Sequence, residues 1–196
     1  ETAAPAMERF QLDKAKIAKT IVYNVPANWK LFEENYRECY HCLANHPEFC
    51  ATVPVDKIHV NRRQVSTRLV QAPNMTFSKY ALRPGAKTQS ISGELVSIPL
   101  GNLTGSDEVP MHALNFYPAH AFAFGLDHGM AYSLHPISAT ESLLTVHWYV
   151  NSRAEEGRDY EAEEVVAFWD ATHRQDIALC AINQQGVNSR RYTPGP

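Results

Sequence analysis

Hydrophobic and polar residues recur with two different periods along the chain, and the changes of period predict where its helices and strands lie. The first long helical pattern begins at Asn28, a residue type that favours the N-cap position. We expect this helix to run to about Asn45 and to end at His46, because Pro47 disfavours helical geometry for the residue before it. The region before this helix contains a short polar pattern, MERFQLDKAKIAK, that predicts a helix, followed by the apolar lead-in TIVYNVP.

Between about residues 58 and 150, β-branched and aromatic residues gather in short segments that Pro, Gly and Asn separate. This pattern predicts an antiparallel sheet of about six strands. The segments that carry it are QVSTRLVQ, MTFSKYAL, QSISGELVSIPL, HALNFYP, AFAFGLDHGMAYSLHP and ESLLTVHWYV.

A second helical pattern follows from about residue 159 to 184, and Gly186 is expected just after its end. A helix, a meandering antiparallel sheet and a second long helix predict an α+β domain, with both helices on one face of the sheet and a hollow between the layers. A chain of 196 residues is long enough for one such domain with a sizeable core.

Composition and charge exclude several classes of protein. The formal net charge is −3, whereas nucleic-acid binding requires a concentrated basic surface, so we expect no nucleic acid as a partner. No stretch approaches the roughly 20 apolar residues of a membrane span, so we expect no membrane either. Three of the four cysteines fall within twelve positions, and the first residues do not resemble a signal peptide, so we predict a cytoplasmic location.

Residues 35 to 49, NYRECYHCLANHPEF, concentrate side chains that bind metals, and four interpretations compete. A zinc knuckle would use Cys39, Cys42, His46 and Cys50, but the segment has no glycine and favours a helix. A redox dithiol at CYHC is disfavoured because Cys39 would lie about ten residues inside the predicted helix, far from the N-terminus that lowers a thiol pKa. The tripeptide CYH matches only the first half of a Rieske pair, since no second half follows.

The fourth interpretation is a 2-His-1-carboxylate site, which leaves open coordination positions on Fe(II). On a straight helix, His41 and His46 would be rotated by about 140° and would not share a face. If the helix breaks at His46, as Pro47 predicts, both imidazoles can turn towards one metal. The carboxylate would then come from an acid on an apolar face elsewhere, where a charge is otherwise costly.

The second helix offers two such acids. At about 100° per residue, Asp176 falls between Val165 and Trp169 on the apolar arc, whereas Asp170 lies at the edge of that arc. Helical geometry favours Asp176 and leaves Asp170 as a competitor. We interpret Cys39 and Cys42 as small helix-packing residues that share a face.

Two of these segments resemble a known family. NWKLFEENYRECYHCLANHPEF resembles the catalytic-domain signature of Rieske non-haem iron oxygenase large (alpha) subunits, and WDATHRQDIALCAINQQGVNS resembles the closing helix of the same domain. The two motifs stand in family order, about 130 residues apart, and the resemblance spans about residues 20 to 195. It implies a helix-grip fold of the START/Bet v1 type, in which an antiparallel sheet wraps around a long C-terminal helix.

The resemblance also implies roles for single residues. His41, His46 and Asp176 would ligate a mononuclear Fe(II), and Asn35 would lie near the metal. Glu38 would be the bridging carboxylate that links an iron-binding histidine to a Rieske histidine of the neighbouring subunit. Electrons would come from a reductase or ferredoxin, and the assembly would be a ring, often a homotrimer.

This sequence departs from the family pattern in two respects. The Rieske domain with its [2Fe-2S] cluster, which normally precedes NWK, is missing, so we expect residues 1–196 to be a single mononuclear-iron catalytic domain, the C-terminal part of a longer chain. In addition, Glu38 in its ECYHC context resembles the branch that acts on choline, betaines or carnitine. An aromatic cage for such a cation could not be identified among the strand aromatics Phe116, Tyr117, Phe122, Phe124 and Tyr132.

These observations lead to a first hypothesis and two alternatives. The first hypothesis is an oxygenase that uses O2 at Fe(II) to hydroxylate or N-demethylate a small substrate, such as a quaternary ammonium compound. The alternative within the family is an aromatic-ring-hydroxylating dioxygenase. The alternative of another class is a non-enzymatic helix-grip module that binds a small ligand.

Overall fold

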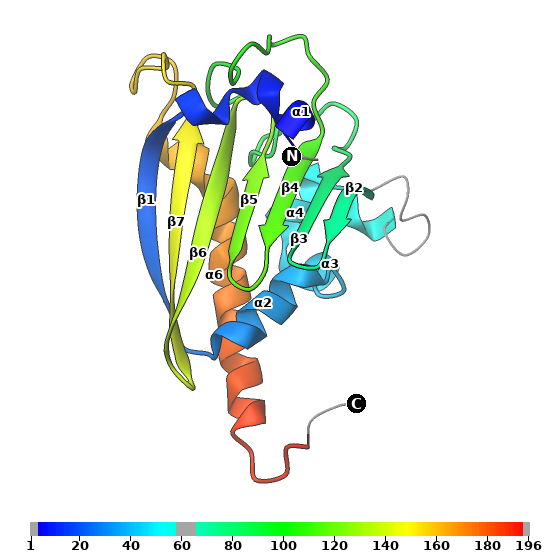
Figure 1. The fold of residues 1–196 in the computed structure, drawn as a ribbon, viewed down its shortest axis with the longest axis vertical. Helices are drawn as coiled ribbons and strands as arrows, with labels where there is room; N and C mark the ends of the chain where they lie inside the picture. The colour runs from blue at the N-terminus through cyan, green and yellow to red at the C-terminus, as the bar shows by residue number, and fades with distance from the viewer. Residues whose placement is uncertain (1–3, 58–65, 194–196) are drawn as a thin grey trace.

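The computed structural model describes residues 4–57 and 66–193, and its central element is an antiparallel sheet (Figure 1). Within these residues the sheet has seven strands in the order β1-β7-β6-β5-β4-β3-β2. The strands are β1 (Lys16–Val25), β2 (Ser66–Ala72), β3 (Met75–Tyr80), β4 (Met111–Phe116), β5 (His120–Phe124), β6 (His128–Ser138) and β7 (Glu141–Val150). All six neighbouring pairs are antiparallel, so the predicted α+β class with a meandering sheet is confirmed.

The helices that matter for the site lie on one face of this sheet. The long helix α6 (Ala162–Val187) packs against β1, and α2 (Trp29–Arg37) and α4 (Pro47–Thr52) pack against α6. Figure 1 shows α6 in orange, running along the sheet. The described chain also has two shorter α-helices, α1 (Ala4–Met7) and α3 (Cys42–Asn45), and three short 3-10 helices at Glu8–Phe10, Leu12–Lys14 and Val55–Lys57. No described helix is long and apolar enough to cross a membrane.

The alternation of side chains along each strand builds two separate clusters of buried residues. In β5, Ala123 belongs to the cluster under α6, whereas Phe124 points to the opposite face. Phe168 of α6 is fully buried in the first cluster with Trp148 of β7, and burying one such side chain contributes about 1.5–3 kcal/mol. The cavity described below opens within the first cluster.

Several predicted boundaries of the helices are wrong. The first long helix ends at Arg37 instead of Asn45, because Glu38 is extended and its carboxylate accepts a hydrogen bond from the backbone N–H of Tyr40. The polar segment before it does not form the predicted helix: Lys16 already belongs to β1 and pairs with Val150. The predicted break at His46 is confirmed, since this residue ends α3 and α4 begins at Pro47.

The predicted number of about six strands fits residues 66–150, which form β2 to β7, but one predicted member is wrong and β1 was not predicted as a strand. Residues 89–100, QSISGELVSIPL, form no strand, because the carboxylate of Asp127 accepts hydrogen bonds from the backbone N–H groups of Val96 and Ser97 in place of a neighbouring strand. The segment AFAFGLDHGMAYSLHP instead supplies both β5 and β6. At the other end of the domain, α6 begins at Ala162 and continues through Gly186 to Val187, three residues past the predicted end at about residue 184.

Candidate metal centre and its cavity

Two interruptions of the helical chain bring the histidines of the CYHC segment together. Residues 38–41 separate α2 from α3, and His46 separates α3 from α4 with φ −122° and ψ 71°. The second break is the one that Pro47 predicts; the first lets His41 turn back towards His46. On α6, Asp176 faces inwards and is 2% exposed, as the helical projection predicts.

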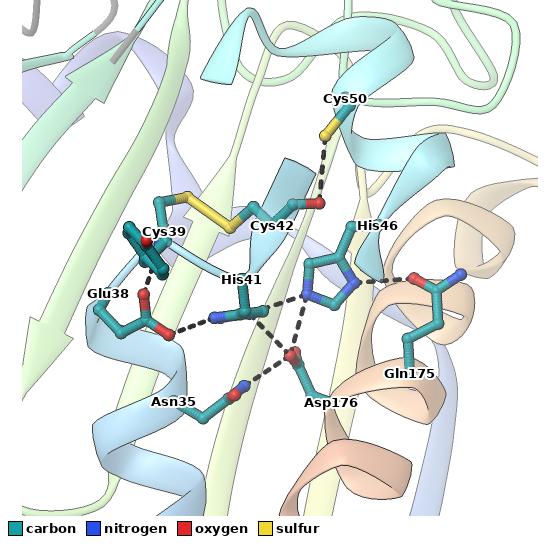
Figure 2. The surroundings of a disulfide bond; sticks show 10 residues. Asn35, Glu38, Cys39, His41, Cys42, His46, Cys50, Gln175 and Asp176 are labelled. Carbon is teal, nitrogen blue, oxygen red and sulfur yellow. Dashed lines mark hydrogen bonds and ion pairs between the residues drawn. A yellow bond between two sulfur atoms is a disulfide. The ribbon is translucent and has the colours of Figure 1, made fainter. Parts of the chain in front are cut away.

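Figure 2 shows the three side chains converging on one point. Nε2 of His46 lies 3.0 Å from Oδ1 of Asp176 and 3.0 Å from Nε2 of His41. Nε2 of His41 lies 3.3 Å from the same carboxylate oxygen. Two ligand atoms about 2.1 Å from one ion and at a right angle to each other are about 3.0 Å apart. The three atoms therefore have the spacing of ligands on one face of an ion, and two imidazoles with one carboxylate form the donor set of non-haem Fe(II) sites.

The charges of this group are arranged to keep the carboxylate ionised. Burial works against ionisation of Asp176, but hydrogen bonds from His41 and His46 hold its pKa at about 2. Asn35 of α2, also buried, donates from Nδ2 to Oδ1 of Asp176 at 2.6 Å. The hydrogen bond with Asp176, followed by that with Glu38, raises the pKa of His41. The ionised Asp176 thus provides a negative charge that offsets the free-energy cost of transferring a cation from water into this buried site.

A further side chain contacts each histidine from behind. Glu38 Oε1 lies 2.5 Å from Nδ1 of His41, and the Glu38 side chain is 47% exposed at the surface. Gln175 Oε1 lies 2.8 Å from Nδ1 of His46. Both contacts use Nδ1, so the Nε2 atoms remain directed at Asp176 (Figure 2). The position of Gln175 directly before Asp176 was visible in the sequence, but its contact with His46 was not.

The competing acid, Asp170, lies away from this group. It accepts hydrogen bonds from Tyr23 at 2.5 Å and from Arg174 at 2.9 Å. Burial opposes its ionisation, but these two hydrogen bonds keep its pKa below the usual value. Its oxygens are therefore committed to a tyrosine and an arginine, and the geometry brings Asp176 alone of the two acids to the histidines.

The cysteines form a disulfide between Cys39 and Cys42, with a Cα–Cα distance of 5.0 Å. The interpretation of these residues as two helix-packing side chains is therefore wrong, because the turn at residues 38–41 brings them within bonding distance. A ligand atom of Cys42 lies within 4.8 Å of those of His41 and His46, but a disulfide sulfur is not a thiolate ligand. The zinc-knuckle set is not available for the same reason. The premise used against a dithiol, a continuous helix around Cys39, is also wrong.

A cavity of about 220 Å³ opens beside the three converging side chains. His41, His46 and Asp176 lie in its wall together with Asn35 and Glu38. The aromatic side chains that line it are Tyr36, Phe49, Tyr80 and Trp169, and the polar ones across the sheet include Arg68, Thr76, Ser78 and Asn115.

Sequence reasoning missed these aromatic residues. The five strand aromatics considered above do not line the cavity; Phe116, Phe122 and Phe124 belong to the cluster on the opposite face of the sheet. A local signal existed for Trp169, which stands seven residues, about two helical turns, before Asp176 on the same face. No local signal places Tyr80 or Arg68 at the cavity, because strand pairing across the sheet brings them there.

The sheet, the long helix that closes it and the cavity with two histidines and one carboxylate are typical of the catalytic domains of Rieske-type oxygenases. The chain belongs to the family described as ring hydroxylating alpha subunit (catalytic domain), whose model matches residues 12–196. The predicted family and the predicted helix-grip fold are therefore confirmed.

Curated relatives and solved structures agree with this assignment. The chain is 31% identical over 211 residues to the glycine betaine monooxygenase oxygenase subunit of Pseudomonas aeruginosa (strain UCBPP-PA14), covering 97% of this chain and 49% of the relative. Over 42 residues it is 52% identical to the carnitine monooxygenase oxygenase subunit of Acinetobacter baumannii (strain ATCC 19606), covering 21% of this chain and 11% of that relative. The fold matches the quaternary ammonium Rieske monooxygenase CntA, crystallised with an inhibitor, with a TM-score of 0.69, 21% identity, and coverage of 97% of this chain and 45% of that one.

The chain spans about half the length of the curated glycine betaine relatives that it matches.

Proposed function

We propose that His41, His46 and Asp176 hold a mononuclear Fe(II) and that the domain is the catalytic domain of an oxygenase acting on a small substrate. One observation carries this proposal: three donor atoms of the appropriate kind converge within 3.0–3.3 Å of one another in the wall of a cavity. The bound iron would supply the activation of O2. The residues of the chain hold the donors in place and bury them, and the cavity gives a substrate access to the open side of the ion.

We further propose that the substrate is an N-methylated, quaternary ammonium compound with a carboxylate. Tyr36, Tyr80 and Trp169 supply aromatic side chains to the cavity, and ring faces attract quaternary ammonium groups. Arg68 lines the same cavity and offers a cation for a carboxylate such as those of glycine betaine and carnitine. The names of the relatives support the same chemical class.

The proposed reaction inserts one oxygen atom into a C–H bond of an N-methyl group. One O2, two electrons and two protons convert that bond to C–OH and release one water. The resulting hydroxymethyl ammonium compound then releases formaldehyde and a proton to leave a tertiary amine. The side chains that point into the cavity hold the methyl group and exclude water during this step. A reductase or ferredoxin partner would supply the electrons.

Glu38 is the proposed entry point for these electrons. It contacts Nδ1 of His41 on one side and is 47% exposed on the other. A Rieske [2Fe-2S] domain, on a part of the protein outside these residues, would approach this carboxylate from a neighbouring subunit in a ring such as a trimer. In support, a structure of CntA is described as giving insight into inter-subunit electron transfer.

The test combines metal analysis with substrate binding. The purified protein is loaded with Fe(II) without oxygen, and glycine betaine, carnitine and naphthalene are titrated by calorimetry. We expect about one iron per chain, together with binding of the two betaines but not of naphthalene. Formaldehyde release with O2 and a ferredoxin–reductase pair then tests the reaction. Absence of iron binding would point to the non-enzymatic ligand-binding alternative, and binding of naphthalene alone to the aromatic-ring alternative.

A further inference from the structure

Three side chains, hydrogen-bonded in series, lead from His46, the proposed ligand at the break between α3 and α4, to the protein surface. His46 is 2% exposed, and its Nδ1 lies 2.8 Å from Oε1 of Gln175. Nε2 of Gln175 donates to Oε2 of Glu48 at 2.8 Å. Glu48 is in the first turn of α4, which begins directly after His46, and Gln175 is on α6 beside Asp176. These hydrogen bonds therefore connect the break at His46 to helix α6, which carries Asp176. His46 and Asp176 are two of the three proposed ligands.

The direction of these hydrogen bonds is fixed from the surface inwards. A carboxylate such as that of Glu48 accepts hydrogen bonds, and Nε2 of Gln175 lies 2.8 Å from its Oε2. Gln175 must therefore present its NH2 group to Glu48 and its oxygen to His46. An oxygen at that position accepts a hydrogen bond, so Nδ1 of His46 carries a proton.

This direction decides what the other nitrogen of His46 can do. Nε2 lies 3.0 Å from Oδ1 of Asp176, an acceptor that by itself would favour a proton on Nε2. An imidazole with its proton on Nε2 cannot ligate a metal through that atom. Gln175 supplies the opposing preference from the far side of the ring, so that the proton lost when a metal binds is the one on Nε2 and the proton on Nδ1 stays.

The two histidines are supported differently. His41 contacts the carboxylate of Glu38 directly, whereas His46 contacts a neutral amide and the charge lies one side chain further away, on Glu48. A neutral acceptor adds no second negative charge next to the buried carboxylate of Asp176, and it still fixes the ring.

We infer that Gln175 and Glu48 are positioning residues that hold the proton of His46 on Nδ1 and so keep its Nε2 free for the metal. The inference rests on the proposed function, since it assigns a role towards the proposed metal. Contacts of this kind typically change metal affinity by about 10- to 100-fold. Neither residue touches the substrate or the metal.

Four variants test the inference through Co2+ affinity, measured by titration of the visible absorption of the purified protein. Gln175→Leu removes the acceptor and is expected to weaken Co2+ binding by about 10- to 100-fold. Glu48→Lys places a donor where an acceptor was, so the Gln175 amide should turn over and affinity should fall similarly. The double variant Gln175→Glu with Glu48→Gln restores an acceptor at His46 and a donor behind it, and should bind Co2+ within about threefold of wild type. Glu34→Lys, at an exposed position of α2, is the charge-matched control and should leave affinity unchanged.

A second readout separates positioning from simple loss of folding. In the Zn2+-loaded wild type, histidine NMR should show a slowly exchanging Nδ1–H of His46, and this proton should exchange quickly in Gln175→Leu while the circular dichroism stays unchanged. Wild-type Co2+ affinity in both Gln175→Leu and Glu48→Lys would overturn the inference and leave the proposed function intact. A wild-type protein that binds neither Co2+ nor Fe2+ would overturn both.

Discussion

Two variants, Asp176→Asn and Asp170→Asn, test which of the two acids of α6 is the third metal ligand. The sequence alone leaves both acids as candidates. The two substitutions are the same in shape and lie on the same helix, six positions apart. Asp176 faces the two histidines, whereas Asp170 faces Tyr23 and Arg174. We expect Asp176→Asn to abolish iron retention and Asp170→Asn to leave about one iron per chain.

The structure also gives a magnitude for the metal-free protein. Although burial alone would raise it, the pKa of Asp176 is lowered from 3.8 to about 2 by its histidine partners. This lowering of the Asp176 pKa corresponds to about 2–3 kcal/mol in favour of the ionised native state. Because the folded-state pKa lies below the unfolded one, this contribution is complete above about pH 4 and is lost as the pH falls towards 2. At pH 7 the metal-free Asp176→Asn variant should therefore lack this whole contribution to the free energy of unfolding.

Thermal unfolding in the presence of a chelator measures this loss. For a chain of this size, about 1 kcal/mol shifts the melting temperature by about 2–4 °C, so Asp176→Asn should melt about 4–12 °C below wild type. The pair between Asp170 and the largely exposed Arg174 contributes about 0–1 kcal/mol, so Asp170→Asn should melt within about 4 °C of wild type. Iron retained by Asp176→Asn, or a larger loss of melting temperature in Asp170→Asn, would refute the assignment of the third ligand.

Three further predictions concern electron entry, the cavity and the opposite face of the sheet. Glu38→Gln keeps an oxygen that can accept a hydrogen bond from His41, so iron content should persist while turnover falls by at least about tenfold. Glu34→Gln is the control. Wild-type turnover in Glu38→Gln would contradict the proposed role of Glu38 as the electron bridge. Arg68→Gln should raise KM for glycine betaine by about tenfold or more, the loss of one charge-assisted hydrogen bond, and leave binding of choline, which has no carboxylate, unchanged in a paired titration. Burial lowers the pKa of His112 from 6.5 to about 4, so this histidine is protonated in the unfolded chain at a higher pH than in the folded one. Its contribution to stability should therefore fall by about 2 kcal/mol between pH 7.5 and 5. His112→Phe should remove that part of the loss in urea unfolding at the two pH values, and an unchanged pH dependence would show that the histidine is not held neutral.

The sequence predicts those parts of the site that depend on local rules. The break at His46 follows from the steric effect of Pro47 on the residue before it, and the inward direction of Asp176 follows from helical periodicity. The break after Arg37 could not be predicted, because it depends on a contact within the turn. There the side chain of Glu38 accepts a hydrogen bond from the backbone N–H of Tyr40. The local composition favoured a continuous helix instead.

The remaining errors arise where a distant residue decides a local structure. The segment of residues 89–100 has strand-forming composition, but the buried carboxylate of Asp127 takes up its backbone N–H groups. Similarly, α6 continues past its expected stop because Gln184 accepts a hydrogen bond from the backbone N–H of Asn28 and donates to Asn188. The cavity lining follows the same rule: Tyr80 and Arg68 reach it only through the pairing of β2 and β3.

The proposed ligands come from positions about 130 residues apart in the chain, His46 and Asp176, with nearly the whole sheet between them. An ion bound by both residues would cross-link the two ends of a loop of that length. Closing such a loop in a disordered chain costs about 4 kcal/mol of entropy, and the folded sheet has already met this cost before any ion arrives. The affinity for the proposed ion would therefore depend on how completely the sheet has folded, and a chain with a misplaced strand would bind it weakly.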